Sequence, residues 1–308
     1  MNITIVGSGG VGAYFGGKLA KAGNNVTFIA RGKHLEAINK NGLTVKSFLG
    51  DFEVKPAFAT DKISKSPKAD LIIIAVKAWQ VKEVAEELLD IIKDDTMVLP
   101  LQNGVLSSEE LRQVLPHNNV LSGLCRIISK IESPGVISHL AVEPSITFGE
   151  FDNSKTERVS ELLKTFQEAG IKSNVADDIQ AERWKKLIYI CSSGWLAVTR
   201  STNGQIMEHP DTKDILLNLF VEVATVARKL GVNIPSDYEE KTLALAETFP
   251  YDSTSSLTRD IWAERPSELE YQNGTVVRLA KKVGVDVPIN RMIYYSLLLM
   301  EKRAREQT

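Results

Sequence analysis

The chain has 308 residues, of which 43% are hydrophobic and 25% charged, as in globular proteins and unlike disordered or fibrous ones. The net charge of −2 excludes nucleic-acid binders that depend on overall positive charge, although a local basic pocket for a small anion stays open. No apolar run approaches the roughly 18 residues that would span a membrane, and the sequence starts without a basic signal region. We therefore expect a cytoplasmic protein that binds neither nucleic acid nor membranes.

The cysteines and histidines do not have the spacing of a metal site. Cys125 and Cys191 form no zinc pattern and no redox pair, so we interpret them as reduced thiols. The four histidines are widely separated along the chain: His34, His117, His139 and His209. We expect no metal cofactor.

The first half of the chain alternates short apolar runs with amphipathic segments, which predicts a parallel sheet covered by helices. The predicted strands are 3–6, 25–30, 43–48, 52–58, 71–76, 97–101, 120–128, 135–140, 145–149 and 171–175. Helices are predicted at 11–22 and 81–92. A turn at Gly50-Asp51 suggests that 43–48 and 52–58 form a hairpin. The uninterrupted apolar run 71–76 is typical of a parallel strand buried on both faces.

After residue 177 the pattern becomes helical, with no convincing strand. The predicted helices are 178–198, 211–231, 235–247, 267–284 and 288–304. Ser267 and Glu270 have the spacing of a capping box, with Ser267 as the N-cap of its helix. We therefore predict an α/β domain with a doubly wound sheet over residues 1–177, followed by an all-α domain over residues 178–308.

A glycine-rich loop follows the first predicted strand and opens the first predicted helix. Its residues fit the pattern G-x-G-x-x-G: Gly7, Ser8, Gly9, Gly10, Val11 and Gly12. Glycines let the backbone approach a pyrophosphate, and the helix N-terminus supplies amides and partial positive charge. The context predicts a dinucleotide site, and a glycine-rich turn without a ligand is the alternative.

The end of the second predicted strand indicates which dinucleotide is bound. An NAD site usually carries an acid about 20 residues after the glycines, to hold the ribose 2′-hydroxyl. This strand ends instead in Arg31-Gly32-Lys33, without an acid. A guanidinium can pair bidentately with a 2′-phosphate, so NADP(H) is favoured over NAD(H). The alternative is that Arg31 and Lys33 are solvated loop charges.

Two other strands end in polar residues, at the sheet edge where ligands of doubly wound sheets bind. Lys77 follows 71–76 and could meet a phosphate or a carboxylate, while Asn103 follows 97–101 and offers donors and an acceptor. Plainer interpretations are a surface charge for Lys77 and a tight turn for Asn103-Gly104.

The helical half supplies candidates for acid–base chemistry. Lys186 lies off the apolar stripe of its helix and could donate a proton to an alkoxide, or could be an exposed lysine paired with Glu182. Glu268 could orient a substrate hydroxyl, or could complement a helix dipole from the first turn. Ser255 and Ser256 start a short helix, where they could hold a carboxylate or act as caps.

Taken together, these segments resemble the ketopantoate reductase (2-dehydropantoate 2-reductase) family over nearly the whole chain. The motifs that carry the resemblance are G-S-G-G-V-G at 7–12, V-K-A-W-Q-V at 76–81, Q-N-G at 102–104, E-R-W-K-K-L at 182–187 and S-E-L-E-Y-Q-N-G at 267–274. The resemblance implies a Rossmann-type domain, a helical domain and NADPH. It also implies reduction of a 2-keto acid to a 2-hydroxy acid, 2-dehydropantoate to pantoate, on the route to pantothenate and coenzyme A.

The resemblance also assigns roles to individual residues. Lys186 corresponds to the catalytic lysine, and Glu268 to the acid that engages the substrate hydroxyl. Asn103 and Ser256 match residues that hold the substrate, as do Lys186 and Glu268. The positions that match cofactor contacts are Gly7, Ser8, Gly9, Gly10, Val11, Gly12, Arg31, Lys77 and Asn103.

The chain departs from the family pattern one and two helical turns after Lys186. The family typically has asparagines there, and this chain has Ile190 and Gly194. Ile190 cannot hydrogen-bond a substrate, so a related 2-keto acid or an opine-type substrate stays an alternative. A catalytically silent NADP(H)-binding sensor is the other alternative. The sequence leaves the oligomeric state open, including a homodimer.

Overall fold

The computed structural model describes residues 1–306, which form two compact units. The first unit comprises Met1–Gln102 and Leu106–Ile179. The second comprises Gln180 onward together with the short segment Asn103–Val105. The candidate residue Asn103 therefore lies in the helical unit, although it is only three residues beyond a strand of the first unit that ends at Pro100.

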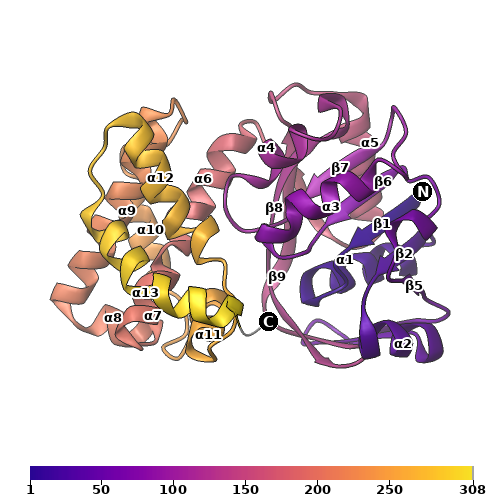
Figure 1. Ribbon diagram of the computed structural model, residues 1–308, viewed down its shortest axis with the longest axis horizontal. Coiled ribbons are helices and arrows are strands. Elements are labelled where there is room, and N and C mark those ends of the chain that lie inside the picture. Colours follow the sequence, from indigo (N-terminus) through magenta and orange to yellow (C-terminus); the bar gives the residue numbers. More distant parts are fainter. Residues whose placement is uncertain (307–308) are drawn as a thin grey trace. The chain divides into compact units, whose positions relative to one another are not determined.

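The first unit is built on a five-stranded parallel sheet (Figure 1). Its strands are β1 (Asn2–Val6), β2 (Asn25–Ile29), β5 (Phe58–Thr60), β6 (Leu71–Ile74) and β7 (Met97–Pro100), in the order β5-β2-β1-β6-β7. The order reverses between β1 and β6, which makes the carboxyl ends of these two strands the switch point of the sheet. This topology confirms the predicted doubly wound, Rossmann-type sheet.

Both faces of this sheet are covered, as the uninterrupted apolar run 71–76 predicted. Leu71 and Ile73 of β6 pack in the same core as Phe15 of α1 (Gly10–Lys21). Ile72 and Ile74 belong to a second core, which contains residues of α3 (Val81–Leu88) and α4 (Ser107–Arg112). The alternation of side chains along a strand sends neighbouring isoleucines to opposite faces.

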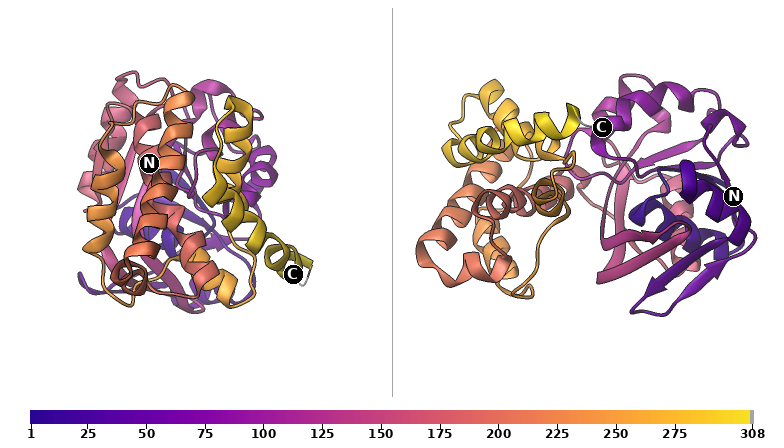
Figure 2. Two further views of the ribbon diagram at one scale, coloured as in Figure 1. Left: turned by 90° about the vertical axis from the view of Figure 1, so that its left-hand side faces the viewer. Right: turned by 60° about the horizontal axis from the view of Figure 1, so that its bottom comes forward.

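The first unit also contains a second sheet, which the sequence pattern did not predict. Its strands are β3 (Leu43–Ser47), β4 (Phe52–Val54), β8 (Leu121–Ser133), β9 (Val136–Glu150) and β10 (Lys172–Val175). The expected hairpin about Gly50 is confirmed, since β3 and β4 pair antiparallel. The long β8–β9 hairpin is visible in Figure 2.

Some predicted strand limits in this region were wrong. The expected strand 52–58 is divided between β4 and β5, which belong to different sheets, and Pro56 between them cannot donate a ladder hydrogen bond. The two strands expected at 135–140 and 145–149 are the single strand β9. Periodicity does not report whether two apolar runs share a strand or which strand pairs with which.

Two longer helices of the first unit were also missed, α2 (Gly32–Asn41) and α5 (Glu157–Glu168). Ile38 is the one residue of α2 that is fully buried. α5 buries Val159, Leu162 and Phe166 at helical spacing, so its pattern was present in the sequence. Three short 3₁₀ turns complete the unit: η1 (Ile63–Lys65), η2 (Ala78–Gln80) and η3 (His117–Asn119).

The second unit is all-helical through residue 306, as predicted (Figure 1). Its elements are α6 (Ile179–Ile190), α7 (Ser192–Thr199), α8 (Asn203–Glu208), α9 (Pro210–Lys229), α10 (Tyr238–Glu247), α11 (Ser256–Trp262), η4 (Leu269–Tyr271), α12 (Asn273–Val283) and α13 (Pro288–Glu306). None of the helices described is long and apolar enough to cross a membrane.

Two helix predictions in this unit need correction. The helix expected at 178–198 is interrupted at Cys191, which separates α6 from α7. The helix expected at 267–284 begins only at Asn273. Ser267 is not its N-cap, because the Ser267 hydroxyl donates to the carboxylate of Glu301 at 2.5 Å. Glu301 is only 4% exposed and also accepts from the Ser267 N–H at 3.0 Å, the donor that a capping box would have directed to Glu270.

Candidate functional site

Two of the three motif glycines in the loop after β1 leave no room for a Cβ, and the third leaves the backbone open. Gly7 has φ +97°, and a Cβ there would lie 2.5 Å from the Val76 nitrogen. A Cβ on Gly12 would lie 2.2 Å from the Gly7 oxygen. A Cβ on Gly9 would meet nothing within 4 Å, so the backbone is open to a ligand there. This cradle fits the pyrophosphate of a dinucleotide.

Hydrogen bonds from two directions hold the loop at Ser8. The Ser8 nitrogen and hydroxyl both donate to the Ile29 carbonyl at the end of β2, at 3.0 Å each. The Ser8 carbonyl lies 2.9 Å from Nε2 of His34 on α2. Nδ1 of His34 accepts from the Gly135 nitrogen at 3.0 Å, in the turn between β8 and β9. Sequence reasoning missed His34, because no local motif marks its two remote partners.

The tautomer of His34 follows from these partners. A carbonyl oxygen can only accept and a backbone N–H can only donate, so the network assigns the neutral ring with its proton on Nε2. Burial lowers the pKa of His34, and the hydrogen bond to the Ser8 carbonyl raises it in part. Burial is the larger effect, so the pKa is lowered overall, which is consistent with a ring that stays neutral at pH 7.

The two cations after β2 lie at the start of α2. Arg31 is the N-cap residue of this helix, and Lys33 is in its first turn. Both side chains are exposed, and neither makes a hydrogen bond or an ion pair within residues 1–306. They are therefore placed to receive an external anion, although exposure is also what solvated surface charges would show.

Lys77 is less exposed than a simple surface charge. It is half-buried at the start of η2, and its ammonium lies 5.8 Å from the centre of the Trp79 ring. The preceding residue, Val76, is the one against which Gly7 packs. In the first unit the fold thus brings Lys77 to the same sheet edge as the glycine loop.

Asn103 and Glu268 meet in the second unit. The Asn103 side-chain amide donates to Oε2 of Glu268 at 3.1 Å, across 165 residues of sequence. Glu268 is only 7% exposed and precedes η4, so it does not lie in the first turn of α12. The helix-dipole interpretation of Glu268 is therefore wrong. Gly104 has φ +98°, and a Cβ there would lie 2.6 Å from the Tyr271 carbonyl oxygen.

A buried acid, Glu301, and its partly exposed partner Arg305 hold the segment that carries Glu268. Glu301 of α13 accepts from the backbone nitrogen of Ser267 at 3.0 Å and pairs with Arg305 at 2.7 Å. Arg305 also donates to the Ser267 carbonyl at 2.9 Å. The sequence holds one signal for this clamp: Glu301 continues the buried stripe of Tyr294 and Leu297 at helical spacing, where an acid needs a partner.

The candidate Lys186 lies on α6 and is half-buried. Glu182 does not pair with it as the plainer interpretation supposed, since Glu182 bonds the neighbouring Lys185 at 2.8 Å. Ile190 is the last residue of α6, and Gly194 lies in α7 against Asn273. The structure thus rules out Glu182 as the ion-pair partner of Lys186.

Ser256 is not the cap of its helix. The hydroxyl of Ser255 accepts from the Thr258 nitrogen at 3.0 Å, which makes Ser255 the N-cap of α11. Ser256 is the first helical residue and is exposed. The Thr258 hydroxyl donates to the Ser193 carbonyl at 2.9 Å, so α11 is attached to α7.

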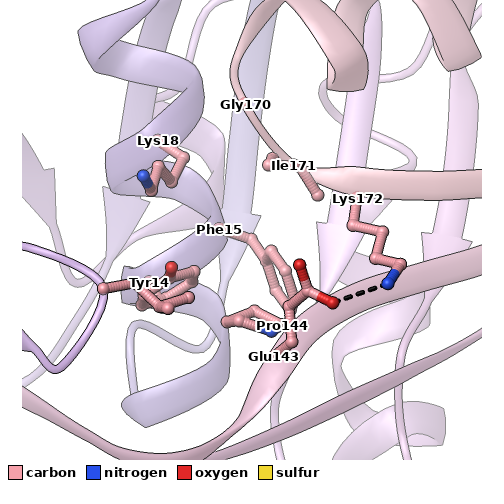
Figure 3. Close-up of a pocket in the computed structure, with 9 residues that line it drawn as sticks. Tyr14, Phe15, Lys18, Glu143, Pro144, Gly170, Ile171 and Lys172 are labelled. Atoms are coloured by element: carbon pink, nitrogen blue, oxygen red, sulfur yellow. Dashed lines mark hydrogen bonds and ion pairs between the residues drawn. The ribbon is translucent and has the colours of Figure 1, made fainter.

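A separate pocket of about 220 Å³ lies beside α1 in the first unit (Figure 3). Tyr14 and Lys18 line it from α1, and Glu143 and Lys172, paired at 2.5 Å, line it from β9 and β10. None of the predicted site residues lines it, so we do not assign the site there. Within residues 1–306, no group of three or more metal-ligating side chains could hold a metal ion.

Comparison with known proteins covers both units. The family model for ketopantoate reductase PanE/ApbA matches residues 3–153, and the model for the C-terminal part of that family matches residues 178–301. A 2-dehydropantoate 2-reductase of Nostoc sp. is 32% identical, covering 98% of this chain and 95% of its own.

Solved structures share the fold over the same extent. A PanE/ApbA family ketopantoate reductase from Ralstonia eutropha matches with a TM-score of 0.90 at 29% identity, covering 99% of this chain and 100% of its own. A D-mandelate dehydrogenase, solved with NADH and anilino(oxo)acetate, matches with a TM-score of 0.89 at 23% identity and covers 99% of each chain. The family matches span both units, and the chain belongs to the ketopantoate reductase family of oxidoreductases.

Proposed function

We propose that this protein reduces a 2-keto acid to a 2-hydroxy acid with NADPH, and that its substrate is 2-dehydropantoate, which gives pantoate. The observation that carries the proposal is the Asn103–Glu268 hydrogen bond of 3.1 Å. It joins the residue that follows β7 to the acid before α12, two positions that family resemblance assigns to the substrate. In the cell, this reaction would serve pantothenate and coenzyme A synthesis in the cytoplasm.

The first unit supplies the features that a dinucleotide needs. Gly9 leaves the loop backbone open, and the N-terminus of α1 follows directly. Arg31 and Lys33 are exposed cations at the position where an NAD site would carry an acid. We therefore assign the pyrophosphate to residues 7–12 and the 2′-phosphate to Arg31, with Lys77 as a further contact at the same edge.

The chemistry divides between the cofactor and the side chains of this chain. Bound NADPH supplies the hydride for the ketone carbon. The Lys186 ammonium polarises the ketone oxygen and gives a proton to the alkoxide that develops on it. Glu268 accepts a hydrogen bond from the substrate hydroxyl, because a carboxylate can accept several and Asn103 occupies one position at Oε2. Asn103 and Ser256 orient the substrate.

A related 2-keto acid is the second candidate substrate. Ile190 and Gly194 stand where the family typically has asparagines, so two amides that could bind substrate are missing here. The D-mandelate dehydrogenase of the same fold, solved with anilino(oxo)acetate, supports the idea that this architecture accepts different side groups. An opine-type substrate belongs to the same alternative.

The test is a steady-state assay of NADPH oxidation with 2-dehydropantoate beside other branched 2-keto acids. We expect the highest kcat/KM with 2-dehydropantoate. A higher value with another keto acid would transfer the assignment to that acid. Absence of turnover with the whole panel, despite tight NADPH binding, would favour the silent NADP(H)-binding sensor.

A further inference from the structure

We propose that His34 is a positioning residue for dinucleotide binding: it holds the glycine loop so that the Gly9 N–H points at the cofactor pyrophosphate. This inference rests on the proposed function, because it requires that the loop binds a dinucleotide. His34 itself does not touch the cofactor in this proposal. It acts through the Ser8 carbonyl, which lies 2.9 Å from its Nε2.

The peptide bond between Ser8 and Gly9 transmits the effect. A trans peptide is planar, so its carbonyl and its N–H point in opposite directions. When His34 fixes the Ser8 carbonyl on one side, it also fixes the direction of the Gly9 N–H on the other. Among the three motif glycines of this loop, Gly9 is the one whose Cβ position has nothing within 4 Å. The held N–H therefore lies at the open part of the loop.

The Gly9 N–H is also a donor in need of an acceptor. Within residues 1–306 it makes no hydrogen bond to the protein. It directly precedes α1, whose first amides and partial positive charge favour an anion. An unpaired amide beside a helix N-terminus, held in a fixed direction, is suited to a pyrophosphate oxygen.

The other side of the imidazole is anchored to a rigid part of the first unit. Nδ1 accepts from the Gly135 nitrogen at 3.0 Å, and the Gly135 carbonyl accepts from the Thr44 nitrogen at 2.9 Å. Gly135 has φ +79°, and a Cβ there would lie 3.1 Å from the Ala37 Cβ of α2. The hairpin turn is thus held by β3 and packed on α2, so the ring has little freedom to move.

Both hydrogen bonds require the neutral ring. Nε2 must donate to a carbonyl while Nδ1 accepts from an N–H, which the neutral imidazole with its proton on Nε2 can do. A leucine at this position has similar bulk and can do neither. A glutamine carries one donor and one acceptor on its amide, so His34→Gln retains the chemistry that His34→Leu removes.

The experiment compares dissociation constants for NADPH and NADH, measured by fluorescence titration of the full chain. We expect His34→Leu to raise both constants about 10-fold, because the pyrophosphate is common to both cofactors. His34→Gln should recover most of the loss. The control His117→Leu removes an exposed imidazole from the same unit and should bind as wild type does. The keto-acid KM at saturating NADPH should not change.

Two results would overturn the inference. The first is a folded His34→Leu variant that binds NADPH with wild-type affinity. The second is a variant that loses affinity for NADPH but not for NADH, which would mean that His34 acts through the 2′-phosphate at Arg31. If His34→Leu does not fold, His34→Asn replaces it, since its shorter amide cannot reach both partners. A wild-type protein that binds neither cofactor would refute the proposed function itself, which distinguishes the two failures.

Discussion

Replacing Gly194 by alanine measures how tightly α7 packs against its neighbours. The new Cβ would lie 2.5 Å from Oδ1 of Asn273 and 2.6 Å from Cγ2 of Ile293. Asn273 is fully buried and cannot move easily, because its amide donates to the Cys191 carbonyl at 3.1 Å and to Asn290 at 3.0 Å. The alanine must therefore displace a fixed, hydrogen-bonded side chain.

Two opposing effects decide the sign of the change. Helix propensity favours alanine over glycine by up to about 1 kcal/mol. Overpacking of a buried position costs about 1–3 kcal/mol, and a displaced Asn273 loses hydrogen bonds worth about 1 kcal/mol each. We expect a net loss of about 1–2 kcal/mol, which lowers Tm by roughly 2–3 °C in a chain of 308 residues. Thermal unfolding followed by circular dichroism measures it.

A double-mutant cycle with Asn273→Ala locates the origin of the loss. If Oδ1 of Asn273 is the obstacle, Gly194→Ala should cost less in the Asn273→Ala background, since the 2.5 Å contact is then gone and the 2.6 Å contact with the Ile293 methyl group remains. A Gly194→Ala variant with a higher Tm than wild type would show that propensity dominates and that the close packing described for α7 is incorrect. The same clash means that an asparagine cannot be added at position 194 alone.

Three further predictions concern the reaction. Lys186→Ala should lower kcat by about 10²- to 10⁴-fold with nearly unchanged NADPH binding. The control Lys185→Ala loses a partly exposed ion pair with Glu182 and a contact with the Tyr238 ring and should retain kcat, so equal small losses would refute the proton-donor role. Arg31→Ala should raise the dissociation constant for NADPH about 10- to 150-fold in titrations and leave that for NADH unchanged. An equal rise in both constants would refute the 2′-phosphate assignment. Ile190→Asn should raise kcat/KM for 2-dehydropantoate relative to kcat/KM for other branched 2-keto acids. An unchanged ratio of the two values would show that the amide is dispensable.

Local chemistry in the sequence was sufficient for much of the first unit. The run 71–76 predicts a strand buried on both faces. In the structure, the successive leucine and isoleucine side chains of β6 alternate between two different cores. The spacing of Gly7, Gly9 and Gly12 predicts a pyrophosphate loop, and in the structure Gly7 and Gly12 leave no room for a Cβ while Gly9 leaves the backbone open. These features depend on neighbours within a few residues, or on the regular spacing of apolar residues along the sequence. The roles of Lys186 and Glu268, in contrast, came from family resemblance.

The tertiary structure decided which polar groups became partners. Ser267 has capping-box spacing, yet its hydroxyl bonds a carboxylate on α13, since burying Glu301 without donors would cost more than a missing cap. Asn103 reaches Glu268 across 165 residues, and His34 joins Ser8 to a hairpin turn. The sequence thus determined the fold class and the geometry of the glycine loop through short-range sterics and periodicity. Hydrogen-bond partners far apart in the chain were decided only by folding, because no local pattern records which buried donor will meet which acceptor.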